Sequence, residues 1–218
     1  MAGRLFIMDV NLTNIAILLV VLLFSMSVHE MLHAYTSKWL GDDTAYHMGR
    51  VTMNPLAHID PFFTIAIPLL LLISGSPILF GAAKPVQVNF SRLRYGEYGG
   101  AMVAMVGPVS NLLIAAVASF IYNLMDPVSG TTAYTIFLYT IALNVGLFIF
   151  NSIPWPPLDG SRLLYAFAPK PLQDLMDSIE RMGIVGLVLF IFLFYQIGGP
   201  IFHLMESMTQ FLAPGLTF

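Results

Sequence analysis

The sequence predicts an all-α, polytopic membrane protein, and three observations lead to that fold class. Of its 218 residues, 57% are hydrophobic and only 10% are charged, whereas about a quarter of an average soluble domain is charged. Several apolar runs approach the ~20 residues that a helix needs to cross a bilayer core. The length suits one integral membrane domain, residues 1–218, with no large extramembrane part and no basic surface for nucleic acid. The sequence has no cysteine, which excludes disulfides and thiolate metal ligands within it.

The first two apolar segments differ in how well they suit a membrane-spanning helix. Residues 12–39 contain the apolar run LTNIAILLVVLLFSMSV, followed by the more polar stretch HEMLHAYTSKW, so we expect a spanning helix. Residues 61–80 carry Pro68 inside and Gly75-Ser76-Pro77 near the end, and these residues break a simple helix. We therefore expect 61–80 to be a re-entrant or interfacial segment.

The run VQVNF, within residues 85–90, alternates apolar and polar side chains as a strand does. A protease attacks an extended backbone, so an exposed strand could hold a substrate by edge pairing through Val86 and Val88. The alternative is a simple surface loop.

Three further apolar segments complete the predicted bundle. Residues 97–123 and 133–153 form a three-helix catalytic core with 12–39, and residues 184–205 add another helix. Small residues recur along one side of the third helix, at Gly99, Gly100, Ala104 and Gly107, and this spacing permits close helix packing. A short helix after Asp159 and an amphipathic one near 172–182 are expected between the last two apolar segments.

The stretch His29-Glu30-Met31-Leu32-His33 carries the chemistry. Two histidines four apart on a helix project from one face, so both can meet one tetrahedral ion. This is the H-E-x-x-H pattern of zinc metalloproteases, in which the intervening glutamate serves as general base. The plainer interpretation is that these polar side chains find hydrogen-bond partners on neighbouring helices. Membrane depth disfavours it, because ionisable residues there are costly to keep.

A catalytic zinc needs a third protein ligand and an open position. Asp159 stands out, because Pro154, Pro156 and Pro157 stop the fourth helix just before it. Irregular backbone at membrane depth is tolerated where it lines a wet cavity. We therefore predict one Zn2+ per chain, held by His29, His33 and Asp159. The alternative for Asp159 is an ordinary helix N-cap.

These motifs resemble the site-2 proteases, which are intramembrane zinc metalloproteases. The resemblance rests on HEMLH, on Gly107-Pro108-Val109-Ser110-Asn111, and on Asn151-Ser152-Ile153-Pro154 with Leu158-Asp159-Gly160, and it covers about residues 25–165. It looks closest to the minimal subgroup, which lacks PDZ and CBS domains. It implies the ligands named above, Glu30 as general base, and Asn151 as a residue that helps hold the substrate or the oxyanion. We expect Asn111 and Asn144 to serve in helix packing rather than in catalysis.

The metal site constrains the topology. His33 and Asp159 can share an ion only on the same side of the membrane, so one intervening segment cannot span, and 61–80 is the natural choice. Eight of the nine basic residues then lie on the active-site side, with only Arg4 opposite. The eight are Lys38, Arg50, Lys84, Arg92, Arg94, Arg162, Lys170 and Arg181. This bias predicts a multi-pass cell-membrane protein whose active site faces the cytoplasm.

The predicted activity is hydrolysis of peptide bonds within or near transmembrane segments of other membrane proteins, as in regulated proteolysis or clearance of membrane-bound remnants. The competing class is a non-catalytic membrane protein that binds or transports metal, or a degenerate protease that acts as a binder. Glu30 separates the two, since a carrier needs no acid beside its ligands. The sequence leaves open the substrate, the regulator, the oligomeric state and the roles of His47 and His58. His203 is expected to pack at the interface.

Overall fold

The structure, a computed structural model, describes residues 12–66, 70 and 83–216, and over this part of the chain its regular elements are all helical. The long helices are α1 (Leu12–Trp39), α4 (Glu97–Met125), α5 (Thr132–Asn151) and α8 (Ile184–Leu212). The short ones are α2 (Thr44–His47), η1 (Pro55–Ala57), η2 (Pro61–Ala66), η3 (Phe90–Arg92), α6 (Asp159–Phe167) and α7 (Lys170–Arg181). The all-α prediction is confirmed, as are the short helix after Asp159 and the amphipathic helix that follows.

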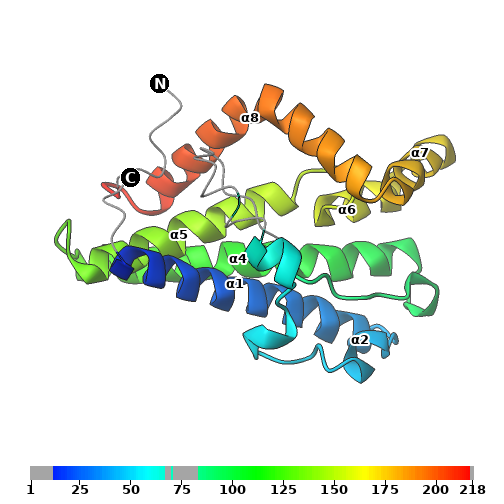
Figure 1. Ribbon diagram of the computed structural model, residues 1–218, viewed down its shortest axis with the longest axis horizontal. Coiled ribbons are helices and arrows are strands. Elements are labelled where there is room, and N and C mark those ends of the chain that lie inside the picture. Colours follow the sequence, from blue (N-terminus) through cyan, green and yellow to red (C-terminus); the bar gives the residue numbers. More distant parts are fainter. Residues whose placement is uncertain (1–11, 67–69, 71–82, 217–218) are drawn as a thin grey trace.

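Three helices, α1, α4 and α5, are long and apolar enough to cross a membrane. Figure 1 shows them side by side along the molecule, with α4 and α5 antiparallel. Helix α4 is central, because it contacts α1, α5, α6 and α8. Its buried small residues Ala115 and Ala118 let α5 approach closely, and Leu138, Ile141 and Val145 of α5 fill the contact. The predicted three-helix core is therefore present.

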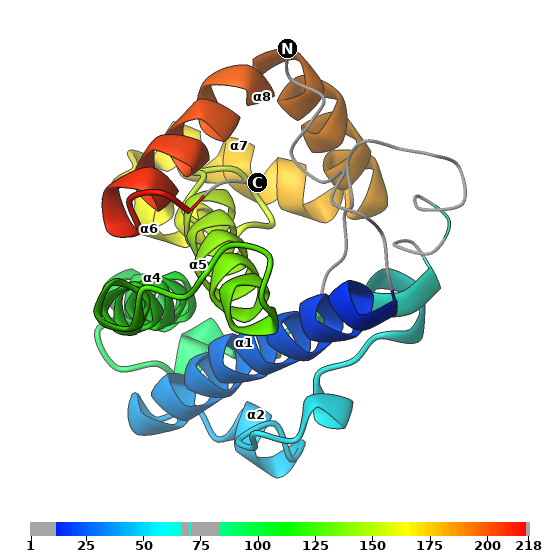
Figure 2. The same cartoon turned by 90° about the vertical axis from the view of Figure 1, so that its left-hand side faces the viewer.

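Helix α8 covers α5 rather than joining the row of three (Figure 2). It carries Pro200 in its interior, and proline removes one helical hydrogen bond and kinks the helix. Figure 1 shows the two arms of α8 meeting at an angle. The helix runs to Leu212, seven residues beyond the predicted end, because Met205, Met208 and Leu212 pack against the core between α4 and α5.

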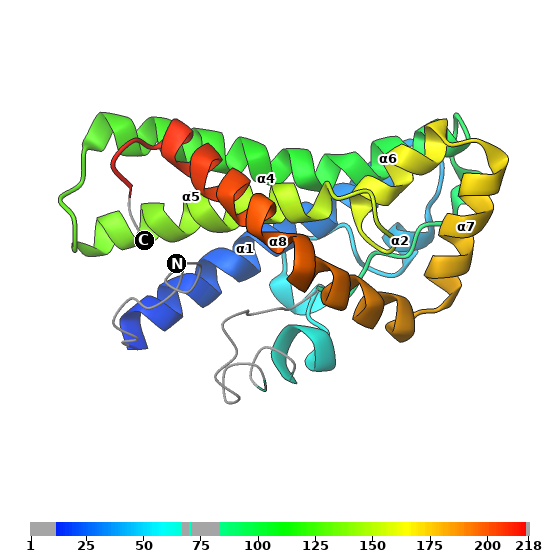
Figure 3. The same ribbon diagram turned by 90° about the horizontal axis from the view of Figure 1, so that it is seen from above.

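The segment after α1 decides the topology. Helix α1 ends, and α4 begins, at the same end of the bundle, where α6 and α7 also lie (Figures 1 and 3). The residues that flank the chain from 40 to 96 thus lie at one end of the three-helix bundle. Of the predicted segment 61–80, residues 61–66 form the single wide turn η2, and the choice between re-entrant and interfacial depends on residues that lie outside the described part.

The predicted strand at 85–90 is wrong. Residues 83–89 have no regular secondary structure, and Phe90 begins the 3-10 helix η3. A strand requires a partner strand, and no described residue supplies one. The alternating pattern is nevertheless real, since Val86, Val88 and Phe90 are half-buried while Gln87 and Asn89 are exposed.

Candidate metal centre

His29 and His33 lie on one face of α1, one turn apart, as their spacing predicts. Both are 6% exposed, and their rings meet edge to face with centroids 4.6 Å apart. The Nδ1 atom of His29 is 2.6 Å from Asn111 Oδ1, and the Nδ1 atom of His33 is 2.6 Å from the Val103 carbonyl oxygen. Both acceptors require a proton on Nδ1. When either ring is neutral, its proton therefore lies on Nδ1 and its Nε2 atom is free to bind a metal.

The hydrogen bond to His29 is the first link of a buried chain. Asn111 donates through Nδ2 to Asn144 Oδ1 at 2.8 Å, and Asn144 donates to Ser25 Oγ at 2.8 Å and to the Thr140 carbonyl. Asn111, Asn144 and Ser25 are each 0% exposed. The chain links α4, α5 and α1, and it fixes the amide of Asn111 with its oxygen, not its nitrogen, toward the imidazole.

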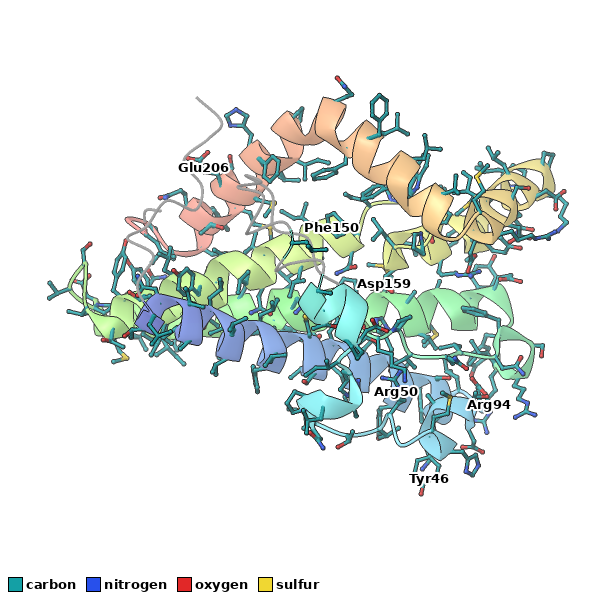
Figure 4. The ribbon with its side chains drawn as sticks, in the orientation of Figure 1. Tyr46, Arg50, Arg94, Phe150, Asp159 and Glu206 are labelled. Atoms are coloured by element: carbon teal, nitrogen blue, oxygen red, sulfur yellow. The ribbon has the colours of Figure 1, made fainter. Side chains whose placement is uncertain are left out.

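Asp159 completes the group as the first residue of α6. Its Oδ2 atom is 3.1 Å from His29 Nε2 and 3.4 Å from His33 Nε2. Gly160 allows α6 to come this close, since a Cβ there would lie 2.7 Å from the Ile153 carbonyl oxygen and closer still to that of Ser152. Burial alone raises the pKa of the Asp159 carboxyl, but the His33 and His29 rings outweigh it and hold the pKa below its ordinary range. Figure 4 shows Asp159 inside the bundle.

The three ligand atoms suit one metal ion. One atom each from His29, His33 and Asp159 lies within 4.8 Å of the other two, and two imidazoles with one carboxylate form a ligand set used by catalytic zinc. Gly107 keeps the neighbouring space open. A Cβ at this position would lie 2.6 Å from His29 Nε2 and closer still to His33 Nε2. Any other residue would therefore press on both metal-facing nitrogens.

Glu30 lies beside the group and has one hydrogen-bond partner among the described residues. The backbone N–H of Val86 donates to its Oε2 atom at 3.2 Å. The other carboxylate oxygen receives no hydrogen bond from that part of the chain. The segment that contains Val86 therefore passes directly alongside the predicted general base.

The other polar residues singled out in the sequence form their hydrogen bonds away from the three ligand side chains. Asn151 donates to the Leu147 carbonyl of its own helix at 3.0 Å, and none of its hydrogen bonds reaches the ligands. His47 and His203 are exposed. His58 is not a surface residue: it is 2% exposed, and its Nε2 atom is 2.9 Å from the Thr52 carbonyl oxygen.

Sequence reasoning assigned too small a role to two features. Asn111 and Asn144 link α4 to α5, as expected of packing residues, and in addition they orient His29. Buried amides in spanning helices are costly, and that cost is the available signal for the added role. Gly107 was grouped with Gly99 and Gly100 as a packing residue. Those two glycines face Arg94 and Phe90, whereas Gly107 faces the histidines, a difference that spacing alone does not reveal.

Several curated proteins similar to this chain are named as zinc metalloproteases. The chain is 39% identical over 182 residues to "Putative zinc metalloprotease YwhC" of Bacillus subtilis, covering 80% of each chain. It is 27% identical over 166 residues to "Putative zinc metalloprotease Rip2" of Mycolicibacterium smegmatis, spanning 61% of that relative. It is 33% identical over 98 residues to "Regulator of sigma-W protease RasP" of Bacillus subtilis, spanning 20% of that relative. No family model and no solved structure matches the chain.

The similarity to YwhC extends over most of both chains, and within this chain the HEMLH histidines and the aspartate of PPLDG converge on one point. The chain belongs to the site-2 protease family of zinc metalloproteases.

Proposed function

We propose that this protein hydrolyses peptide bonds within or near transmembrane segments of other membrane proteins, as an intramembrane zinc metalloendopeptidase. One observation carries the proposal: His29 Nε2, His33 Nε2 and a carboxylate oxygen of Asp159 converge within 4.8 Å, and the histidines lie on a helix apolar enough to cross a membrane. Relatives named as zinc metalloproteases support the same chemistry. The minimal subgroup is the part of the family that we favour.

The residue roles follow from the geometry. A zinc ion held by His29, His33 and Asp159 would polarise the scissile carbonyl and acidify a water molecule. Glu30, fixed by Val86, has one carboxylate oxygen available to take the proton from the attacking water and return it to the leaving amine nitrogen. We assign Asn151 to the substrate or the oxyanion, as the resemblance implies. Its position at the end of α5, just before the proline-rich turn into Asp159, is compatible with that role.

Val86 and Val88 remain our candidates for holding an extended substrate, although the segment is not a strand. Side chains alternate between half-buried and exposed from Val86 to Phe90, so an extended substrate could run along this segment. No described residue pairs with the N–H or C=O of Val88. A substrate bonded there would lie alongside Glu30. Val88→Pro should weaken cleavage, and unchanged cleavage would rule out edge pairing.

The active site faces the cytoplasm in this proposal. The eight basic residues of the predicted inner side belong to the end of α1 and its following loop, the segment before α4, and helices α6 and α7. These elements lie at one end of the bundle (Figure 1). A positive bias of this kind marks the cytoplasmic side.

The test combines metal analysis with cleavage of single-span membrane proteins by the purified full chain. Glu30→Gln should abolish cleavage while zinc stays bound, because Glu30 is not a ligand. Glu206→Gln, an exposed acid on α8 far from Asp159 (Figure 4), is the matched control and should cleave like the wild type. Cleavage by Glu30→Gln would refute the mechanism. Zinc retained by a His33→Ala, Asp159→Ala double variant would refute the ligand set and favour a different metal role.

A further inference from the structure

The segment Lys84–Phe90, which passes beside Glu30, is held by a buried arginine from the loop after α1. We infer that Arg50 is a positioning residue for the general base and acts through the peptide unit between Pro85 and Val86. This inference rests on the proposed function for its catalytic consequence, while the structural device itself can be tested without any cleavage assay.

Arg50 is a buried cation whose hydrogen bonds go to backbone carbonyls. It is 3% exposed, and its guanidinium donates to the carbonyl oxygens of Ala57, Lys84 (3.4 Å) and Pro85 (3.3 Å). No described carboxylate forms an ion pair with it. Burying a guanidinium is costly, and its planar fork of donors can serve several acceptors at once. The hydrogen bonds of the Arg50 guanidinium therefore hold this stretch of backbone in place.

One peptide unit is held from both sides. The Pro85 carbonyl accepts from Arg50, and the N–H of the same unit, which belongs to Val86, donates to Glu30 Oε2 at 3.2 Å. In a trans peptide the C=O and N–H point in opposite directions. The unit thus lies between the guanidinium and the carboxylate. A cation on the carbonyl polarises the unit and strengthens its N–H as a donor.

The flanks of this peptide unit have separate anchors. Lys84 donates through its N–H to the His58 carbonyl at 2.8 Å, and the Asn89 N–H donates to Asp42 Oδ2 at 2.7 Å. The Phe90 ring lies under the Arg162 guanidinium, 4.3 Å from its centroid. Losing Arg50 should therefore release the central peptide unit while the ends of the segment stay attached.

The consequence for catalysis follows from what Glu30 must do. A general base has to hold one oxygen within hydrogen-bond reach of its proton donor, and small misplacements of such a group are costly in rate. With Val86 fixed on Oε2, the carboxylate has one orientation and Oε1 is the free oxygen. Without Arg50, the Val86 N–H is no longer held in place and the carboxylate can turn.

The experiment compares Arg50→Met, which keeps length but loses all donors, with Arg94→Met as matched control. Arg94 is exposed and points away from the molecule (Figure 4). Hydrogen exchange resolved to single amides is followed in the full chain in detergent. We expect the Val86 amide to lose its protection in Arg50→Met and the Asn89 amide to keep it. Zinc content should stay unchanged, and kcat should fall about 10- to 100-fold with KM unaltered. Arg94→Met should match the wild type in every readout.

A second variant guards against misfolding of Arg50→Met. Val86→Pro removes the same N–H from the other side and should lower kcat to a similar extent. The inference is overturned if Val86 stays protected in Arg50→Met, or if Val86→Pro cleaves as well as the wild type. If the wild type cleaves no substrate but the Val86 amide still loses its protection in Arg50→Met, the proposed function is refuted. The conclusion that Arg50 holds the Val86 peptide unit is then still supported.

Discussion

Each histidine of the metal centre uses one ring nitrogen for the protein and keeps the other for the ion. The protein-facing acceptors are a side-chain amide for His29 and a backbone carbonyl for His33. An unpaired imidazole N–H at this depth would cost ~1–3 kcal/mol, so each bond both stabilises the fold and fixes the tautomer. The two acceptors differ in one respect: only Asn111 can be removed by a side-chain substitution.

Asn111→Ala should weaken zinc binding about 10- to 100-fold, the usual range for loss of a group that orients a metal ligand. The variant deprives His29 of its acceptor and leaves Asn144 without its donor. Zinc affinity is measured by competition with a chelator. Asn123→Ala, on the same helix but exposed and hydrogen-bonded to the Leu212 carbonyl, is the control and should bind zinc like the wild type. Equal zinc affinities in the two variants would show that Asn111 does not contribute to zinc binding.

Gly107→Ala should abolish zinc binding with little loss of helix formation, because alanine favours helices more than glycine does. The added methyl would lie 2.6 Å from His29 Nε2 and closer to His33 Nε2, so the rings must turn away from the ion. Zinc content and circular dichroism report the two effects separately. Gly199→Ala in α8, where a Cβ meets nothing within 4 Å, should leave zinc content unchanged. Full zinc content in Gly107→Ala would show that the histidines can bind zinc despite the added methyl group.

At the scale of elements, the site is assembled by helix ends and breaks. Helix α4 contains Pro108, which removes the helical hydrogen bond to the Ala104 carbonyl and loosens the helix around it. The neighbouring Val103 carbonyl accepts a hydrogen bond from His33. Helix α5 stops at Asn151 before the prolines, and α6 starts directly with Asp159. The metal ligands thus come from the middle of one helix and the first residue of another.

The end of α1 is fastened to its surroundings by Asp42, a side chain that is 0% exposed. The carboxylate accepts from Ser37 Oγ at 3.0 Å, from the Thr44 N–H and hydroxyl, and from the Asn89 N–H. Burial alone raises the pKa of the Asp42 carboxyl, and these hydrogen bonds together outweigh it and leave the pKa below its ordinary value. The ionised form therefore stabilises the junction between α1, α2 and the segment before α4.

Asp42→Asn should lower the free energy of unfolding at neutral pH by ~1–3 kcal/mol, and the loss should shrink in acid. The unfolded state takes up a proton at a higher pH than the folded state does. Stability from Asp42 is thus complete above the ordinary pKa and is lost as pH falls through the lowered folded value. Unfolding in detergent from pH 7 down to pH 3 measures the difference. Asp43→Asn, an exposed neighbour with no capping hydrogen bond, should differ little from the wild type at any pH. A pH-independent difference for Asp42→Asn would contradict this account.

At the scale of the whole molecule, the local signals in the sequence predicted most of the fold and only part of the site. Apolar runs and proline breaks gave the long helices within a few residues, except at the end of α8, where packing against the core extends the helix. The histidines and Asp159 carry short motifs, so their grouping could be predicted. Asn111 and Asn144 are separated by 33 residues, and whether they meet depends on how α4 and α5 rotate against each other, which no local pattern records. The prediction of a strand at 85–90 is wrong because alternating burial specifies two faces of a segment but not a partner strand.

The topology can be tested on a chain without native cysteine, because each single-cysteine variant then reports one position. Gln87→Cys, exposed beside the metal centre, should react with an impermeant thiol reagent only from the cytoplasmic side, since α1, α4 and α5 bring the segment before α4 to the positively charged end. Ser129→Cys, exposed in the turn between α4 and α5 at the opposite end, is the matched control and should react only from outside. Accessibility is compared in intact cells and in inverted vesicles. Labelling of both cysteines from the same side would exclude an odd number of crossings by α4, and labelling of Gln87→Cys from outside alone would reverse the orientation of the metal centre.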